Sequence, residues 1–98
     1  MDPDSGASPF AVVHDVAASW QDYHLVRQTV RGTSMPGLIL HAAGPTQDGF
    51  RTIDVWACEA DWHRHRPRLA HAFDDLVVPP VVRELQIGHL ICTPTMPG

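Results

Sequence analysis

Lysine is absent from this chain of 98 residues, and only 18% of its residues are charged. The formal net charge is −4, which argues against a nucleic-acid partner because phosphate contacts need a basic surface. No apolar run approaches the roughly 20 residues that a membrane-spanning helix needs. The first nine residues carry Asp2 and Asp4 where a signal peptide would have a basic and then an apolar region. We therefore expect a cytoplasmic protein without a membrane partner.

Cysteine is also scarce. Cys58 and Cys92 lie in or at the ends of apolar predicted strands, where reduced and buried thiols are expected. The sequence has no glycine-rich strand-to-helix turn of the kind that binds flavin or nicotinamide, and no cluster with metal-ligand spacing. His63 and His65 are two residues apart, and on a helix such residues do not share a face. We predict neither a cofactor nor a bound metal.

The length predicts one domain over residues 9–92, with a disordered arm at 1–8 and a tail at 93–98. Alternating apolar residues and turn residues predict strands at 9–16, 37–43, 50–58 and 81–92. Helical spacing of apolar residues predicts helices from Ser19 to Gly32 and from Glu59 to the Pro79-Pro80 pair. Ser19 is expected to accept a hydrogen bond from the Asp22 amide.

The second helix contains Pro67, which cannot donate to the carbonyl of His63 and is expected to kink or break the helix. The element order is strand, helix, strand, strand, helix, strand. Right-handed crossovers close this order into an α+β, ferredoxin-like βαββαβ fold, with a four-stranded antiparallel sheet and both helices on one face.

The hairpin predicts which side chains share a face of the sheet. A turn over residues 44–49 would pair Ala43 with Phe50. The mixed face then carries Ile39, His41, Thr52, Asp54 and Trp56, and the apolar face carries Leu38, Leu40, Ile53 and Val55. We expect the mixed face to line a pocket beneath the helices. We expect the apolar face to pack on a second sheet in a homodimer.

These hairpin residues also carry a family resemblance. The segments Gly37-Leu-Ile-Leu-His41-Ala-Ala-Gly-Pro45, Asp48-Gly-Phe-Arg51 and Ile53-Asp-Val-Trp56, followed by Glu59-Ala-Asp-Trp62, resemble the antibiotic-biosynthesis monooxygenase-like branch of the dimeric α+β barrels. The resemblance implies that two subunits pack their sheets face to face, with a cavity in each subunit.

Relatives of this kind include cofactor-independent quinone-forming monooxygenases of polyketide pathways, cyclases, isomerases and haem-degrading enzymes. The pocket of the quinone-forming enzymes uses a tyrosine, an asparagine, a tryptophan and a further aromatic. The matching positions here hold His41, Thr52, Trp56 and Trp62. The haem-degrading members use a tryptophan and a histidine ten residues apart, where this sequence has His65 and Asp75.

His41 and Asp54 are the candidate catalytic residues, because a carboxylate on the same face can orient an imidazole as a general base. The alternative is a core histidine and a loop-capping aspartate. Six further residues are candidates for substrate binding, namely Thr52, Trp56, Trp62, His65, His14 and His89. For each of them the alternative role is core packing or a structural hydrogen bond. The facing of His14 and His89 stays open. The arginines at 64, 66 and 68 could receive an anionic group or form a solvated helix face.

The leading hypothesis is a small cofactor-independent enzyme of polyketide-type secondary metabolism. It would abstract a proton from an aromatic or polyketide-like substrate, and the product would cyclise, isomerise or react with oxygen. The alternative is a non-catalytic small-molecule or haem-binding module, or an accessory subunit of the same fold.

Overall fold

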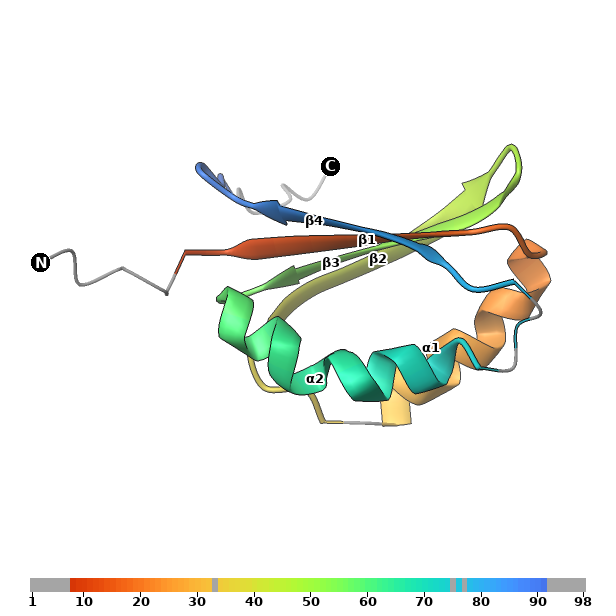
Figure 1. Cartoon of the computed structure of the whole chain (residues 1–98), viewed down its shortest axis with the longest axis horizontal. Coiled ribbons are helices and arrows are strands. Elements are labelled where there is room, and N and C mark those ends of the chain that lie inside the picture. The colour runs from red at the N-terminus through yellow and green to blue at the C-terminus, as the bar shows by residue number, and fades with distance from the viewer. Residues whose placement is uncertain (1–7, 33, 75, 77, 92–98) are drawn as a thin grey trace, which may run out of the picture.

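The computed structural model describes residues 8–32, 34–74, 76 and 78–91. Its elements are β1 (Phe10–Val16), a short 3₁₀-helix η1 (Trp20–Asp22), α1 (Tyr23–Gly32), β2 (Leu38–Thr46), β3 (Gly49–Trp56), α2 (Glu59–Ala72) and β4 (Val81–Gln86). The strands form one antiparallel sheet in the order β2-β3-β1-β4 (Figure 1). The predicted βαββαβ fold is confirmed.

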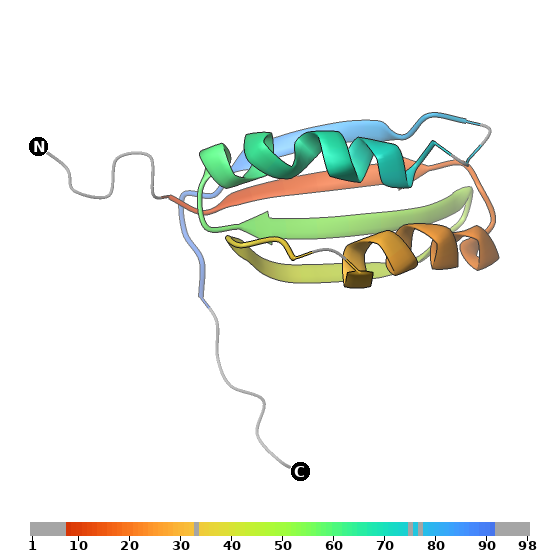
Figure 2. The ribbon, with the colours of Figure 1, turned by 90° about the horizontal axis from the view of Figure 1, so that it is seen from below.

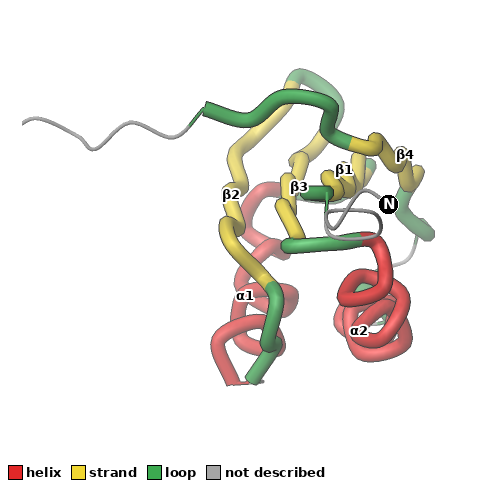
Figure 3. The backbone as a smooth tube through the Cα atoms, turned by 90° about the vertical axis from the view of Figure 1, so that its left-hand side faces the viewer, coloured by secondary structure: helices red, strands yellow, loops and turns green. Residues whose placement is uncertain are grey.

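Both helices cover the same face of the sheet. Helix α1 lies beneath β2, and α2 lies beneath β1 and β4 (Figures 2 and 3). The apolar residues on the covered face explain this arrangement, since Val12, Phe50 and Trp56 are fully buried there. We call the opposite face the uncovered face, although the chain after β4 crosses it at one end (Figure 3). No helix among the described residues is long and apolar enough to cross a membrane.

The two helices differ in detail from the prediction. Ser19 Oγ accepts from the Gln21 amide at 3.0 Å, and the Asp22 amide donates to the Ser19 carbonyl at 2.8 Å instead. The first turn is therefore the tighter 3₁₀ form. Helix α2 continues through Pro67, so of the two predicted outcomes, a kink or a break, the break does not occur. Buried Trp62 and Leu69 on either side of Pro67 hold the helix against the sheet, and this packing outweighs the one lost backbone bond.

The hairpin turn is shorter than predicted, and the pairing of its two strands is shifted by two residues. Strand β2 runs to Thr46 and β3 begins at Gly49, so His41 pairs with Asp54 and not with Thr52. Pro45 is compatible with β2 because β2 is an edge strand, where a missing amide donor is tolerated. A Cβ atom at Gly49 would collide with the backbone carbonyl of Val16, so only glycine fits this close approach.

An irregularity near the start of β2 changes the predicted faces. Leu38 pairs with Trp56 and Leu40 pairs with Val55, which leaves Ile39 as an extra residue. Leu38 therefore turns to the helix side and packs against the core, whereas Ile39 is 52% exposed. The predictions that Leu38 belongs to the uncovered face and Ile39 to the face of His41 are wrong, because an extra residue reverses the alternation.

Strand β4 is shorter than predicted. Within the described residues, the last backbone bond between this segment and the β1 side runs from the Ile87 amide to the Pro9 carbonyl at 2.9 Å, next to the start of β1 at Phe10. Cys58 is half-buried with a free thiol that donates to Asp61 Oδ2 at 3.3 Å. The predicted N-terminal arm up to residue 7, Cys92 and the predicted tail lie outside the described residues.

Candidate active site

A band of polar side chains crosses the helix-facing side of the sheet. It consists of His14 on β1, Thr52 and Asp54 on β3, and His41 on β2, and we call it the polar belt. His14 is the cross-strand partner of Thr52, and His41 is the partner of Asp54. Apolar clusters around Trp56 and around Phe50 lie on its two sides. Three belt residues are almost fully buried, at 3%, 1% and 2% exposure for His14, Thr52 and Asp54.

Asp54, His41 and Tyr23 form a continuous hydrogen-bonded chain. The Asp54 carboxylate bonds Nδ1 of His41, and Nε2 of His41 lies 2.6 Å from the Tyr23 hydroxyl. A carboxylate only accepts, so Nδ1 carries the proton of the first bond. In the neutral imidazole Nε2 is then the acceptor, and Tyr23 donates to it. Asp54 therefore fixes the ring and its tautomer, and Tyr23 covers the basic nitrogen.

Tyr23 is the site residue that the sequence analysis missed. Burial and then the Asp54 charge raise the pKa of Tyr23, and the Arg27 guanidinium opposes them. Trp20 stacks on the phenol ring with centroids 4.8 Å apart and planes at 8°. In the sequence, Tyr23 follows the helical spacing of the apolar residues Trp20, Val26 and Val30. This spacing is a usable signal, because a tyrosine hydroxyl that turns toward a core needs a polar partner.

An open groove of about 500 Å³ leads to this chain of side chains along α1 and β2. Its lining includes Trp20, Tyr23, His24, Arg27 and His41. The side chain of His41 is 17% exposed and that of Asp54 only 3%. The imidazole is thus within reach of a small molecule in the groove, while the carboxylate behind it is shielded from water.

The aromatic candidates pack together under α2. The Trp56 ring stacks on His65 at 5.4 Å and 15°, and Trp62 lies 6.2 Å from Trp56. His65 Nε2 bonds the Pro36 carbonyl at 3.2 Å. Trp62 Nε1 donates to Glu84 Oε2 at 3.2 Å. Within the described residues, no three His, Cys, Asp or Glu side chains come together to hold a metal ion.

Neither a protein-family model nor a curated protein sequence gives a significant match to the chain. Solved structures do match it. Rv0793 from Mycobacterium tuberculosis superposes with a TM-score of 0.69 at 16% identity, covering 87% of this chain and all of that one. A monooxygenase from the ActVA-Orf6 gene of Streptomyces coelicolor, solved with nanaomycin D, gives 0.60 at 17%, covering 93% and 96%.

SnoaB, a cofactor-independent oxygenase from Streptomyces nogalater, gives a TM-score of 0.56 at 16% identity, covering 89% of this chain and 96% of that one. The chain has the fold of the antibiotic biosynthesis monooxygenase-like proteins.

Within this monooxygenase-like fold three of the predicted site residues line two separate openings, and four others, Thr52, Asp54, Trp56 and His65, line neither of them. His41 lines the groove along α1 and β2, whereas His14 and Trp62 line a separate pocket of about 420 Å³ at the other side. His89, the candidate whose facing the sequence left open, lies beyond the end of β4, is exposed and lines neither opening. The strand that would have carried it ends where β1 ceases to pair.

Proposed function

We propose that the chain is a small cofactor-free enzyme that removes a proton from an aromatic or polyketide-like substrate, with His41 as the base. The chain of bonds from Asp54 through His41 to Tyr23 carries this proposal. A carboxylate buried to 2% exposure is suited to stabilise the imidazolium that forms when His41 takes a proton. Such positioned acid–base groups contribute about 10²–10⁴-fold to a rate.

In the proposed reaction Tyr23 carries the proton from the substrate to His41. An acidic phenol or C–H of the substrate lies in the groove beside the Tyr23 oxygen. That oxygen takes the substrate proton while its own proton passes to Nε2 of His41. Because the pKa of Tyr23 is raised, a free phenolate is disfavoured, and the two transfers occur together. Asp54 keeps its charge throughout and balances the imidazolium.

The substrate is left as an enolate or phenolate. Return of the proton at another carbon gives isomerisation, and attack on an internal carbonyl gives cyclisation. Reaction of the carbanion with dioxygen gives oxygenation. This third outcome is supported by the fold likeness to a protein that is named a cofactor-independent oxygenase.

Hydrogen exchange tests the proton abstraction without knowledge of the final product. Hydroxylated anthrones and aryl 1,3-diketones would be incubated with the protein in D₂O, and loss of the acidic C–H signal would be followed by NMR. His41→Gln should slow the catalysed exchange about 10²–10⁴-fold while ligand binding persists. His24→Gln is the matched control, because His24 lines the same groove but bonds only the Gln21 carbonyl among the described residues.

A non-catalytic binding module or accessory subunit is the second candidate. It is favoured by one observation, namely that Nε2 of His41 already has a partner in Tyr23, as a purely structural histidine would. In that case the wild type would not accelerate exchange above background, and His41→Gln would change ligand affinity alone.

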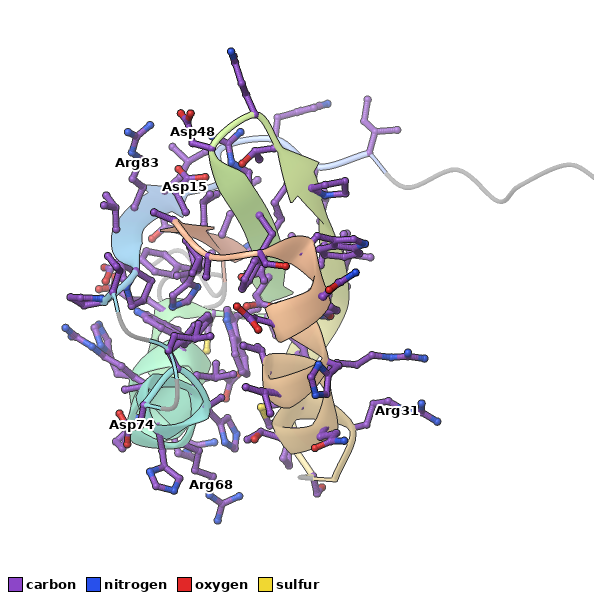
Figure 4. All side chains as sticks on the ribbon, turned by 90° about the vertical axis from the view of Figure 1, so that its right-hand side faces the viewer. Asp15, Arg31, Asp48, Arg68, Asp74 and Arg83 are labelled. Atoms are coloured by element: carbon purple, nitrogen blue, oxygen red, sulfur yellow. The ribbon has the colours of Figure 1, made fainter. Side chains whose placement is uncertain are left out.

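We also propose that two copies associate through the uncovered face of the sheet. Leu40, Ile53, Val81 and Leu85 lie on this face and are 52%, 38%, 56% and 64% exposed. Large contiguous apolar patches are unusual on soluble monomers. The charged residues of this face gather at the hairpin end, where Asp15 and Arg83 lie near each other (Figure 4), and Arg51 pairs with Asp15 at 2.6 Å.

A further inference from the structure

The second pocket has no part in the proton transfer proposed above. It has a volume of about 420 Å³ and lies between α2 and strands β1 and β4. It shares no lining residue with the groove along α1 and β2. Its main walls are His14, Trp62, Arg66, Phe73, Pro80 and Val82. The volume falls within the range of ordinary small-molecule sites.

His14 gives this pocket a buried polar group that lacks a partner. Its side chain is 3% exposed, and Nδ1 has no hydrogen-bond partner among the described residues. Burial lowers the pKa of His14 more than the Asp54 charge raises it, so the ring is neutral and offers one donor and one acceptor. Nδ1 is itself closed to solvent, so a ligand hydroxyl in the pocket would bond the ring at its other nitrogen, Nε2.

Aromatic rings hold His14 in place. Phe73 stacks on the imidazole at 4.8 Å and 16°, and Trp62 meets it edge-on at 5.9 Å and 73°. Together with Pro80 and Val82 these rings make the pocket largely apolar. A flat ring therefore fits the walls better than a sugar or an extended polar chain, because its faces need no hydrogen bonds.

Arg66 supplies a cation to the same pocket. It is exposed, lines the pocket from α2, and forms no salt bridge within the described part of the chain. Asp74 also lines the pocket, but its Oδ2 already bonds His71 Nδ1 at 2.7 Å. Asp74 keeps its negative charge there, and the guanidinium of Arg66 is the group at this opening that can bind a carboxylate with paired hydrogen bonds.

We infer that this pocket binds a small aromatic carboxylate that carries a ring hydroxyl. The carboxylate bonds Arg66, the ring lies against Trp62 and Val82, and the hydroxyl bonds the imidazole of His14. The inference stands apart from the proposed proton abstraction, since none of these residues belongs to the chain from Asp54 to Tyr23.

Calorimetry with 4-hydroxybenzoate and with benzoate tests the inference. The wild type should bind 4-hydroxybenzoate saturably and more tightly than benzoate. Arg66→Gln should weaken 4-hydroxybenzoate binding about tenfold or more, because it removes a charge-assisted pair. Arg68→Gln is the matched control: Arg68 lies two residues further on the same helix, is not in the pocket lining and points away from the body of the molecule (Figure 4). It should change affinity less than about twofold.

His14→Phe tests the polar contact, and it should abolish the preference for 4-hydroxybenzoate over benzoate. Equal weakening by Arg66→Gln and Arg68→Gln would reveal nonspecific charge attraction and overturn the site. An unchanged preference in folded His14→Phe would overturn the role of His14. Tyr23→Phe should leave affinity unchanged, and a loss there would place the ligand in the other groove and refute the inference. Absence of saturable binding at millimolar ligand would refute it as well.

Discussion

Replacing His41 with leucine would leave the carboxylate of Asp54 buried without its hydrogen-bond donor. The Asp54 side chain is 3% exposed, so water cannot take the place of the imidazole. Breaking a buried charged pair by removing one partner costs about 3–5 kcal/mol. We take the lower end, about 3 kcal/mol, because the His41 side chain retains 17% exposure and the site lies near an open groove.

A double-mutant cycle separates this interaction from the loss of packing. Asp54→Asn keeps an acceptor for Nδ1–H of His41 and should cost about 1–2 kcal/mol. The double variant His41→Leu/Asp54→Asn buries an unpaired amide where His41→Leu alone buries an unpaired charge, and an amide is less costly to bury. The combined loss should therefore fall short of the sum of the two single losses by about 1–2 kcal/mol.

Urea denaturation followed by tryptophan fluorescence would measure the free energies of unfolding. Protein concentration must be held constant, because self-association would otherwise contribute to the apparent stability. For a domain of this size, about 3 kcal/mol corresponds to a lowering of Tm by about 12–24 °C.

His71→Leu is the matched control for the cycle. His71 and Asp74 form a histidine–aspartate pair at 2.7 Å, but their side chains are 81% and 63% exposed. Exposed pairs contribute about 0–1 kcal/mol, so this variant should unfold much like the wild type. A loss in His41→Leu no larger than that in His71→Leu, or a coupling energy within about 0.5 kcal/mol of zero, would refute a buried and energetically important His41–Asp54 pair.

Four further predictions follow from the described contacts. Tyr23 is the only tyrosine in the sequence, so tyrosinate absorbance at high pH reports the ionisation of Tyr23 alone. Asp54→Asn should lower the pKa of Tyr23, since the Asp54 charge is one cause of the raised value. The pKa of His14 is lowered in the folded state. The free energy of unfolding should therefore decrease as the pH falls below about 6.5, the pKa of a histidine in the unfolded chain. His14→Phe should make this decrease smaller in acid titrations. Light scattering at micromolar concentration should give a dimer for the wild type and a monomer for Leu85→Asp, and a monomeric wild type would contradict the proposed sheet interface. Gly37 has φ of +94° with the Asp61 side chain against it, so Gly37→Ala should destabilise the fold by about 1–3 kcal/mol in the same urea assay.

The element order and the faces of most hairpin residues were predictable because they depend on local periodicity. Turn residues between apolar runs indicated the strands, and helical spacing indicated α1 and α2. The predicted register was wrong by two residues, yet His41, Thr52, Asp54 and Trp56 still share the helix-facing side. Side chains alternate with a period of two, so an even shift preserves the faces and changes only the partners.

The extra residue at Ile39 and the end of β4 were not predictable from the same pattern. An extra residue in a strand can be recognised only from the pairing with the neighbouring strand, which here places Leu38 opposite Trp56. Strand β4 ends at Gln86, which is paired with Phe10 at the start of β1, although the apolar sequence continues. Pairing with another strand, and not local preference, decides both features.

The sequence by itself determined the βαββαβ order and placed His41 and Asp54 on neighbouring strands, because alternation and turn chemistry are local properties. Tertiary structure alone decided that Tyr23 bonds His41 across 18 residues of sequence. It also decided that His14 lines a separate pocket. Both arrangements depend on where each helix rests on the sheet, and packing of whole elements sets that position.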